Sequence, residues 1–138
     1  MNDIEANVLV HGINMKPGKP TIIAEYNNKL FFGLPGQPLS AYMVLDNFMN
    51  EIIATIYNSS KIELPYFEGE LLMNIHAAKG RRTYQEVNYE NGIVTPRFTK
   101  AGMISALSKA SGYVIIDEFN EGLTAGTMVK VYQFGGRL

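Results

Sequence analysis

Two lysines in a short loop near the start of the chain are the side chains best suited to bind an anion. Lys16 and Lys19 lie in the segment Lys-Pro-Gly-Lys-Pro at 16–20. Proline fixes the backbone φ angle at about −65° and glycine permits a reversal between the prolines, so we expect a stiff loop. Two ammonium groups in one stiff loop repel each other unless solvent screens them or an anion lies between them. The loop therefore predicts a site for phosphate or a similar oxyanion, with a solvated turn as the alternative.

A second proline-glycine turn follows at a short distance. It runs from Pro35 to Pro38, where a segment with helical periodicity begins. The first N–H groups of a helix have no partner within the helix, so they can face an anion, and the side chains of Gln37 and Ser40 can add hydrogen bonds. The turn predicts that the backbone approaches the same ligand, while an ordinary strand-to-helix connection explains it equally well.

Two further segments are candidates for the same kind of ligand. Arg81 and Arg82 form a second basic cluster, and arginine can bind phosphate or carboxylate through two hydrogen bonds. Segment 102–108 can present a helix start and the hydroxyl group of Ser105. A solvated loop and a packed turn are the alternatives. No catalytic residue and no metal ligand stands out from its type and spacing. The expected substrate-binding residues are Lys16, Gly18, Lys19, Pro35, Gly36, Gln37, Pro38, Ser40, Arg81, Arg82 and Ser105.

Short strands and one helix are expected to position these loops. β-Branched and aromatic residues predict strands over 6–10, 21–26 and 30–34, with a tight turn at Asn27-Asn28 because asparagine tolerates positive φ. A helix is predicted over 38–57, where apolar residues recur at steps of three and four. This apolar stripe predicts packing into the core. It consists of Leu45, Phe48, Met49, Ile52, Ile53 and Ile56.

The chain changes character after a polar break at residues 58–65, where we place the domain boundary. Beyond it, short strand-like segments alternate with turn signals, and this pattern predicts a small barrel or curled sheet. A short helix is predicted over 103–109. The fold class is therefore an α/β segment followed by a small all-β, barrel-like domain. The predicted strands of the second domain are 70–77, 82–89, 92–98, 112–116 and 128–134.

Composition limits the classes of protein that need to be considered. The chain has 138 residues, of which 46% are hydrophobic and 18% charged, as in a globular protein. The net charge of −1 implies no general attraction to nucleic acid or to an anionic membrane, so an anion site must be local. The chain has no cysteine, which excludes disulfides and thiolate metal sites and suits the cytoplasm. We also expect no membrane span and no signal peptide.

The first of the two pieces is too small to stand alone securely. Three strands and one helix bury little apolar surface, and at least one sheet edge and one face would lack partners. We therefore expect a missing N-terminal half, a partner chain or self-association.

The two loops also resemble one protein family closely. Residues 8–20, which lead into the lysine loop, and residues 32–41, around the second turn, are similar to the molybdopterin molybdotransferases, also called molybdenum insertases. Weaker similarity continues through residues 80–82, 102–113 and 121–126. The resemblance covers nearly the whole chain.

This resemblance implies a function and a domain organisation. The family inserts molybdenum from molybdate into adenylylated molybdopterin, releases AMP, uses magnesium and acts as a cytoplasmic homodimer. Residues 1–57 are then expected to be the C-terminal half of its molybdopterin-binding α/β domain, 58–65 a linker and 66–138 its C-terminal β-barrel domain. The implied partners are molybdopterin or its adenylate, molybdate and a second copy of the chain.

The sequence also departs from the family pattern. Gln37 stands where the family usually carries asparagine, and Glu86 stands where many members carry a basic residue. The family's upstream Thr-Gly-Gly loop and acidic metal-binding positions have no counterpart in this sequence. The magnesium ligands are therefore expected outside this chain, which resembles a C-terminal fragment of a longer enzyme.

Two alternatives to an enzyme fragment remain open. A scaffold or dimerisation module of gephyrin-like architecture would bind peptides through an apolar patch, with Phe31, Phe32 or Tyr66 as members. An inert piece that folds only by pairing with another copy would unfold in a concentration-dependent manner.

Overall fold

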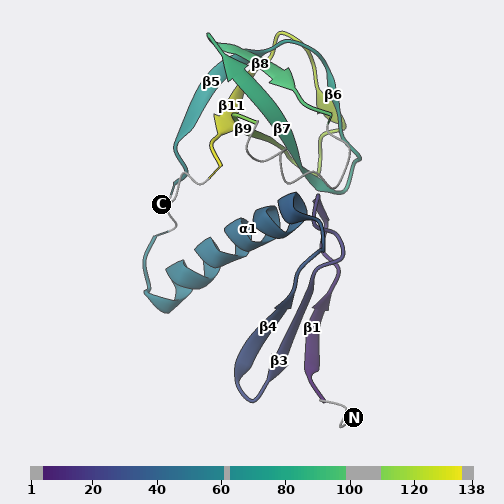
Figure 1. Ribbon diagram of the computed structural model, residues 1–138, viewed down its shortest axis with the longest axis vertical. Helices are drawn as coiled ribbons and strands as arrows, with labels where there is room; N and C mark the ends of the chain where they lie inside the picture. Colours follow the sequence, from purple (N-terminus) through teal and green to yellow (C-terminus); the bar gives the residue numbers. More distant parts are fainter. Residues whose placement is uncertain (1–4, 61–62, 99–109, 135–138) are drawn as a thin grey trace.

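Two lobes make up the protein in the computed structural model, which describes residues 5–60, 63–98 and 110–134 (Figure 1). One lobe is a three-stranded sheet with a long helix, and the other is a small β-barrel. Helix α1 (Pro38–Ile56) lies between the sheet and the barrel in Figure 1. No helix among the described residues is long and apolar enough to cross a membrane. The helix predicted over 103–109 lies outside the described residues.

An antiparallel sheet with strand order β1-β3-β4 forms the far end of the first lobe (Figure 1). β1 (Asn7–His11), β3 (Ile22–Tyr26) and β4 (Lys29–Gly33) confirm the three predicted strands. The hairpin turns at Asn27 and Asn28, whose φ angles of 50° and 59° lie in the left-handed region that asparagine tolerates. The predicted hairpin turn is therefore confirmed.

The lysine loop begins at a short strand that pairs with the barrel. β2 (Met15–Lys16) lies parallel to β7 (Arg82–Glu90) of the barrel, with Lys16 opposite Thr83. The backbone N–H of Arg82 donates a hydrogen bond to the carbonyl oxygen of Asn14 (3.0 Å). The start of the loop is thus held by the edge of a barrel strand.

Helix α1 begins at Pro38, as predicted, because the fixed φ and missing N–H of proline suit the first helical turn. Its fully buried residues are Ser40, Met43 and Val44. Met43 and Val44 belong to an apolar cluster that also contains Met15 of β2 and two tyrosines of the barrel. The barrel-facing side of the helix is therefore its buried side.

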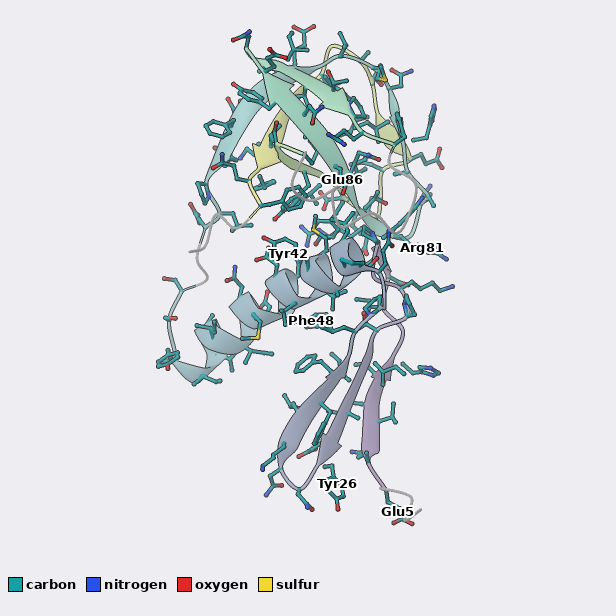
Figure 2. The ribbon with its side chains drawn as sticks, viewed as in Figure 1. Glu5, Tyr26, Tyr42, Phe48, Arg81 and Glu86 are labelled. Atoms are coloured by element: carbon teal, nitrogen blue, oxygen red, sulfur yellow. The ribbon has the colours of Figure 1, made fainter. Side chains whose placement is uncertain are left out.

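The prediction that the apolar stripe of the helix packs into a core is wrong for most of its members. Leu45, Met49 and Ile53 are 46%, 40% and 38% exposed, and Ile56 is more exposed still. Phe48, labelled in Figure 2, does pack against the sheet, since the centroid of its ring lies 6.2 Å from that of Phe32. The periodicity identified a helix correctly, but the described residues contain nothing that covers this side of it.

Five strands close into a barrel in the second lobe, which confirms the predicted barrel. The strand order is β7-β8-β5-β11-β9, and β9 pairs again with β7. The predicted strand over 70–77 is wrong as a single element, because β5 ends at Leu71 and a separate short strand, β6, pairs with β10. The remaining elements are β5 (Tyr66–Leu71), β6 (Ile75–His76), β8 (Ile93–Pro96), β9 (Gly112–Ile116), β10 (Gly122–Leu123) and β11 (Met128–Tyr132).

Aliphatic side chains fill the barrel, and aromatic side chains join it to helix α1. The barrel core consists of Leu71, Ile75, Val87, Val94, Val114, Ile116, Val129 and Val131. At the junction, the ring of Tyr113 lies 5.8 Å from that of Tyr84 and 5.4 Å from that of Phe134. The ring of Phe134 in turn lies 5.7 Å from that of Tyr42 on the helix. The two lobes therefore share one packed interface.

The first lobe leaves apolar side chains and strand edges uncovered. Val8, Leu30 and Phe31 are each about half exposed. Among the described strands, neither β1 nor β4 has a neighbour on its outer edge. These residues form an antiparallel sheet with one helix, which by itself does not confirm the predicted half of an α/β domain.

Candidate anion-binding site

The loops that the sequence singled out meet at one cavity of about 450 Å³ between the two lobes. The predicted site residues that line it come from the lysine loop, the second proline-glycine turn, the first turn of α1 and the residue before β7. Met15, Pro17 and Pro20 complete the lining. Of the predicted residues, the cavity contains Lys16, Gly18, Lys19, Pro35, Gly36, Gln37, Ser40 and Arg81.

Backbone and side-chain hydrogen bonds hold the lysine loop in shape. The buried hydroxyl group of Thr21 donates to the carbonyl oxygen of Gly18 (2.7 Å), and the N–H of Ile13 donates to the carbonyl oxygen of Lys19 (3.0 Å). Gly18 has a φ of 131°, and a Cβ added there would lie 2.7 Å from Cγ2 of Val44 on α1. Only glycine lets the loop approach the helix this closely. The loop is thus pressed onto α1 from one side and paired with β7 at its start.

The second turn presents a fixed amide side chain at the start of the helix. Gln37 is the N-cap residue of α1, and its side chain makes no capping hydrogen bond to the helix. The hydroxyl group of Ser40, which is buried, donates instead to Oε1 of Gln37 (2.8 Å). Pro38, the first helical residue, does not line the cavity. The hydrogen bond leaves the amide NH₂ group of Gln37 available as a donor.

The two neighbouring arginines point to different places. Arg81 lines the cavity of the lysine loop, at the junction of the lobes (Figure 2). Arg82 lines two other cavities, and its Nε lies 3.7 Å from Oδ1 of Asp117. Successive side chains of a strand point to opposite faces, which separates the pair at the start of β7. The sequence predicted both arginines for one site, but the structure brings only Arg81 to it.

The lining is positively charged although the chain is slightly negative. It contains Lys16, Lys19 and Arg81 and no aspartate or glutamate. Glu86, which stands where many molybdotransferases carry a basic residue, does not line the cavity and is buried in β7. Ser105 lies outside the described residues. The arrangement can bind an anion, but it offers no pair of groups for general acid–base catalysis.

A magnesium ion does not fit the residues of this cavity. Magnesium prefers carboxylate and water oxygens, and the lining residues carry no carboxylate. Within residues 5–60, 63–98 and 110–134, no three or more His, Cys, Asp or Glu side chains cluster in a way that could hold a metal.

The sequence did not predict that Met15 lines the cavity or that Tyr84 and Asn47 connect the barrel to α1. Met15 is buried beneath the lysine loop and lines the cavity, yet a single methionine before a lysine carries no signal of its own. Tyr84 and Asn47 connect the barrel to α1 and line a separate cavity, which shares Met15 with this one. They lie 37 positions apart and show no joint pattern in the sequence.

Comparisons with known proteins show which family this chain is similar to. Residues 68–134 match the family model "MoeA C-terminal region (domain IV)". The chain is 32% identical over 126 residues to a molybdopterin biosynthesis protein of Methanocaldococcus jannaschii, a match that covers 91% of this chain and 30% of the relative. Residues 68–134 of this chain are thus similar to the C-terminal region of MoeA proteins.

Further relatives are similar over a comparable share of this chain. A molybdopterin molybdenumtransferase of Haemophilus influenzae is 28% identical over 129 residues, covering 88% of this chain and 32% of the relative. The crystal structure of the molybdopterin biosynthesis MoeA protein from Pyrococcus horikoshii superposes with a TM-score of 0.78 at 28% identity, covering 94% of this chain and 33% of that one. This chain therefore spans about a third of the length of the relatives it matches.

Proposed function

We propose that the cavity of the lysine loop binds an oxyanion, either molybdate or a phosphate group of molybdopterin or its adenylate. The observation that carries the proposal is the convergence of Lys16, Lys19 and Arg81 on one cavity whose lining has no carboxylate. The two lysines act as compact charges, whereas the planar guanidinium group of Arg81 can donate two parallel hydrogen bonds to one oxyanion. Gln37 adds a neutral donor.

The anion site would serve the insertion of molybdenum into adenylylated molybdopterin, with release of AMP. Support comes from relatives whose names describe molybdopterin molybdenumtransferases. In this reaction the residues of this chain bind and orient the anionic substrate and offset its charge. Magnesium would depend on carboxylate ligands from outside the described residues.

The proposal includes a place for this chain within a larger assembly. Residues 1–57 would be the C-terminal half of a molybdopterin-binding α/β domain, 58–65 a linker, and 66–138 the C-terminal barrel domain of a homodimer. The uncovered strand edges and half-exposed apolar side chains of the first lobe support an additional layer of structure there.

Binding of molybdate by isothermal titration calorimetry tests the proposed function. Lys16→Ala and Lys19→Ala should each weaken binding by about tenfold to a hundredfold, since each removes a charged hydrogen-bond donor. Lys29→Ala is the matched control, because Lys29 begins β4 and does not line the cavity. Binding should also weaken with added salt. Equal affinities of all three variants and the unmodified chain would contradict the proposal.

A scaffold function is the second candidate, and the exposed apolar side chains favour it. Phe31 is 50% and Tyr66 46% exposed, so both are available to a partner, whereas the ring of Phe32 packs near Phe48. Peptide binding that persists in high salt would favour the scaffold. Salt-sensitive binding of molybdate or of a pterin phosphate would favour the anion site.

A further inference from the structure

The proposed anion site is built from both lobes, so its geometry depends on how they are joined. Lys19 and Gln37 come from the first lobe, Lys16 comes from β2, which pairs with barrel strand β7, and Arg81 is the residue before β7. A shift of the barrel relative to α1 would move Arg81 with respect to Lys19 and Gln37. Contacts between β7 and the helix therefore determine whether the cations can hold one anion together.

One such contact lies on β7, three residues beyond Arg81. The hydroxyl group of Tyr84 donates a hydrogen bond to Oδ1 of Asn47 on α1 (2.9 Å). Nδ2 of Asn47 donates in turn to the carbonyl oxygen of Met43 (2.7 Å), which fixes the orientation of the amide. Tyr84 is 5% exposed and packs in the cluster that joins the lobes. A phenol is protonated at neutral pH, and burial raises the pKa of Tyr84 further, so its hydroxyl group is a donor there.

We propose that the Tyr84–Asn47 hydrogen bond positions Arg81 relative to Lys19 and Gln37 and so acts as a positioning contact for the anion site. This inference rests on the proposed function. The hydrogen bond fixes the first residues of β7 against the third turn of α1. The close contact of Gly18 with Val44 holds the lysine loop on the same helix, while β2 joins the start of that loop to β7. Loss of the bond should therefore affect the contribution of Arg81 and leave that of Lys19 unchanged.

A double-mutant cycle on the full chain tests this inference, with molybdate as the probe in isothermal titration calorimetry. In the unmodified background, Arg81→Ala should weaken binding by about tenfold or more. In the Tyr84→Phe background, which keeps the ring and its packing, the factor by which Arg81→Ala weakens molybdate binding should fall to about threefold or less. The factor for Lys19→Ala should be the same in both backgrounds. Asn47→Ala should reproduce the effect of Tyr84→Phe from the other side of the bond.

The outcomes separate the inference from the function on which it rests. An equal factor for Arg81→Ala in both backgrounds would overturn the positioning role alone. A parallel fall in the factors for Arg81 and Lys19 would also overturn it, because it would indicate general loosening of the cavity. No effect of Arg81→Ala or Lys19→Ala in the unmodified background would overturn the proposed function itself. Circular dichroism melts verify that each variant is folded before it is titrated.

Discussion

The close approach of the lysine loop to helix α1 leads to a prediction about Gly18. A Cβ at this position would lie 2.7 Å from Cγ2 of Val44, which is fully buried, and the backbone there has a φ of 131°. Valine has a stiff χ1 angle within a helix, so it cannot easily rotate away. Overpacking costs about 1–3 kcal/mol, and left-handed backbone costs about 1–2 kcal/mol more for a residue with a Cβ. Gly18→Ala should therefore lower the free energy of unfolding by about 2–5 kcal/mol.

The assay is equilibrium unfolding in urea, with Gly36→Ala as the matched control. Gly36 lines the same cavity, but a Cβ there meets no atom within 4 Å and its φ is not positive. With a slope of about 2 kcal/mol per molar urea, Gly18→Ala should lower the midpoint by about 1–2.5 M, while Gly36→Ala should leave it nearly unchanged. Equal midpoints for the two variants would refute the reasoning that the loop is pressed onto the helix.

Three further predictions concern the barrel and its junction with α1. Leu71→Ala should lower the free energy of unfolding in urea by about 2–5 kcal/mol, because Leu71 is only 1% exposed. Leu72→Ala, at a position that is 56% exposed, should lower it by less than about 1 kcal/mol. Similar losses for the two variants would contradict the assigned core. Gly112→Ala should lower the melting temperature sharply, since a Cβ there would overlap the carbonyl oxygen of Tyr132 where β9 pairs with β11. An unchanged melting temperature would contradict this close approach of the two strands. Burial raises the pKa of Tyr84 above its ordinary value of 10.0, so the unfolded chain loses this proton first and the free energy of unfolding should fall as the pH rises above about 10. Tyr84→Phe should make that fall shallower, and an unchanged pH profile would count against a buried phenol.

Local signals were sufficient to predict most of the elements. The hairpin at Asn27-Asn28 requires positive φ at both positions, and Pro38 suits only the first turn of a helix, so short-range chemistry determines both features. The strands of the barrel alternate with turns such as Asn91-Gly92, whose φ angles of 50° and 82° are again a local requirement. These features depend little on the rest of the chain.

The features that could not be predicted depend on contacts between the lobes. The side of α1 that is buried is decided by where the barrel lies, so the stripe of Leu45, Met49 and Ile53 was assigned to the core incorrectly. Arg81 and Arg82 are equivalent in the sequence, and the register of β7 against β2, which the sequence does not reveal, directs one of them into the cavity. The two lysines could be predicted because a single stiff loop carries both.

The central claim is that cations from both lobes converge on one anion site, and the neighbouring arginines test it most directly. Molybdate affinity of Arg81→Ala and Arg82→Ala should be measured under identical conditions by isothermal titration calorimetry. Both variants lose one positive charge from adjacent positions, but only Arg81 lines the cavity. We predict that Arg81→Ala weakens binding by about tenfold or more and that Arg82→Ala changes it by less than about twofold. Equal effects of the two substitutions would show that only net charge matters and would contradict the proposed site.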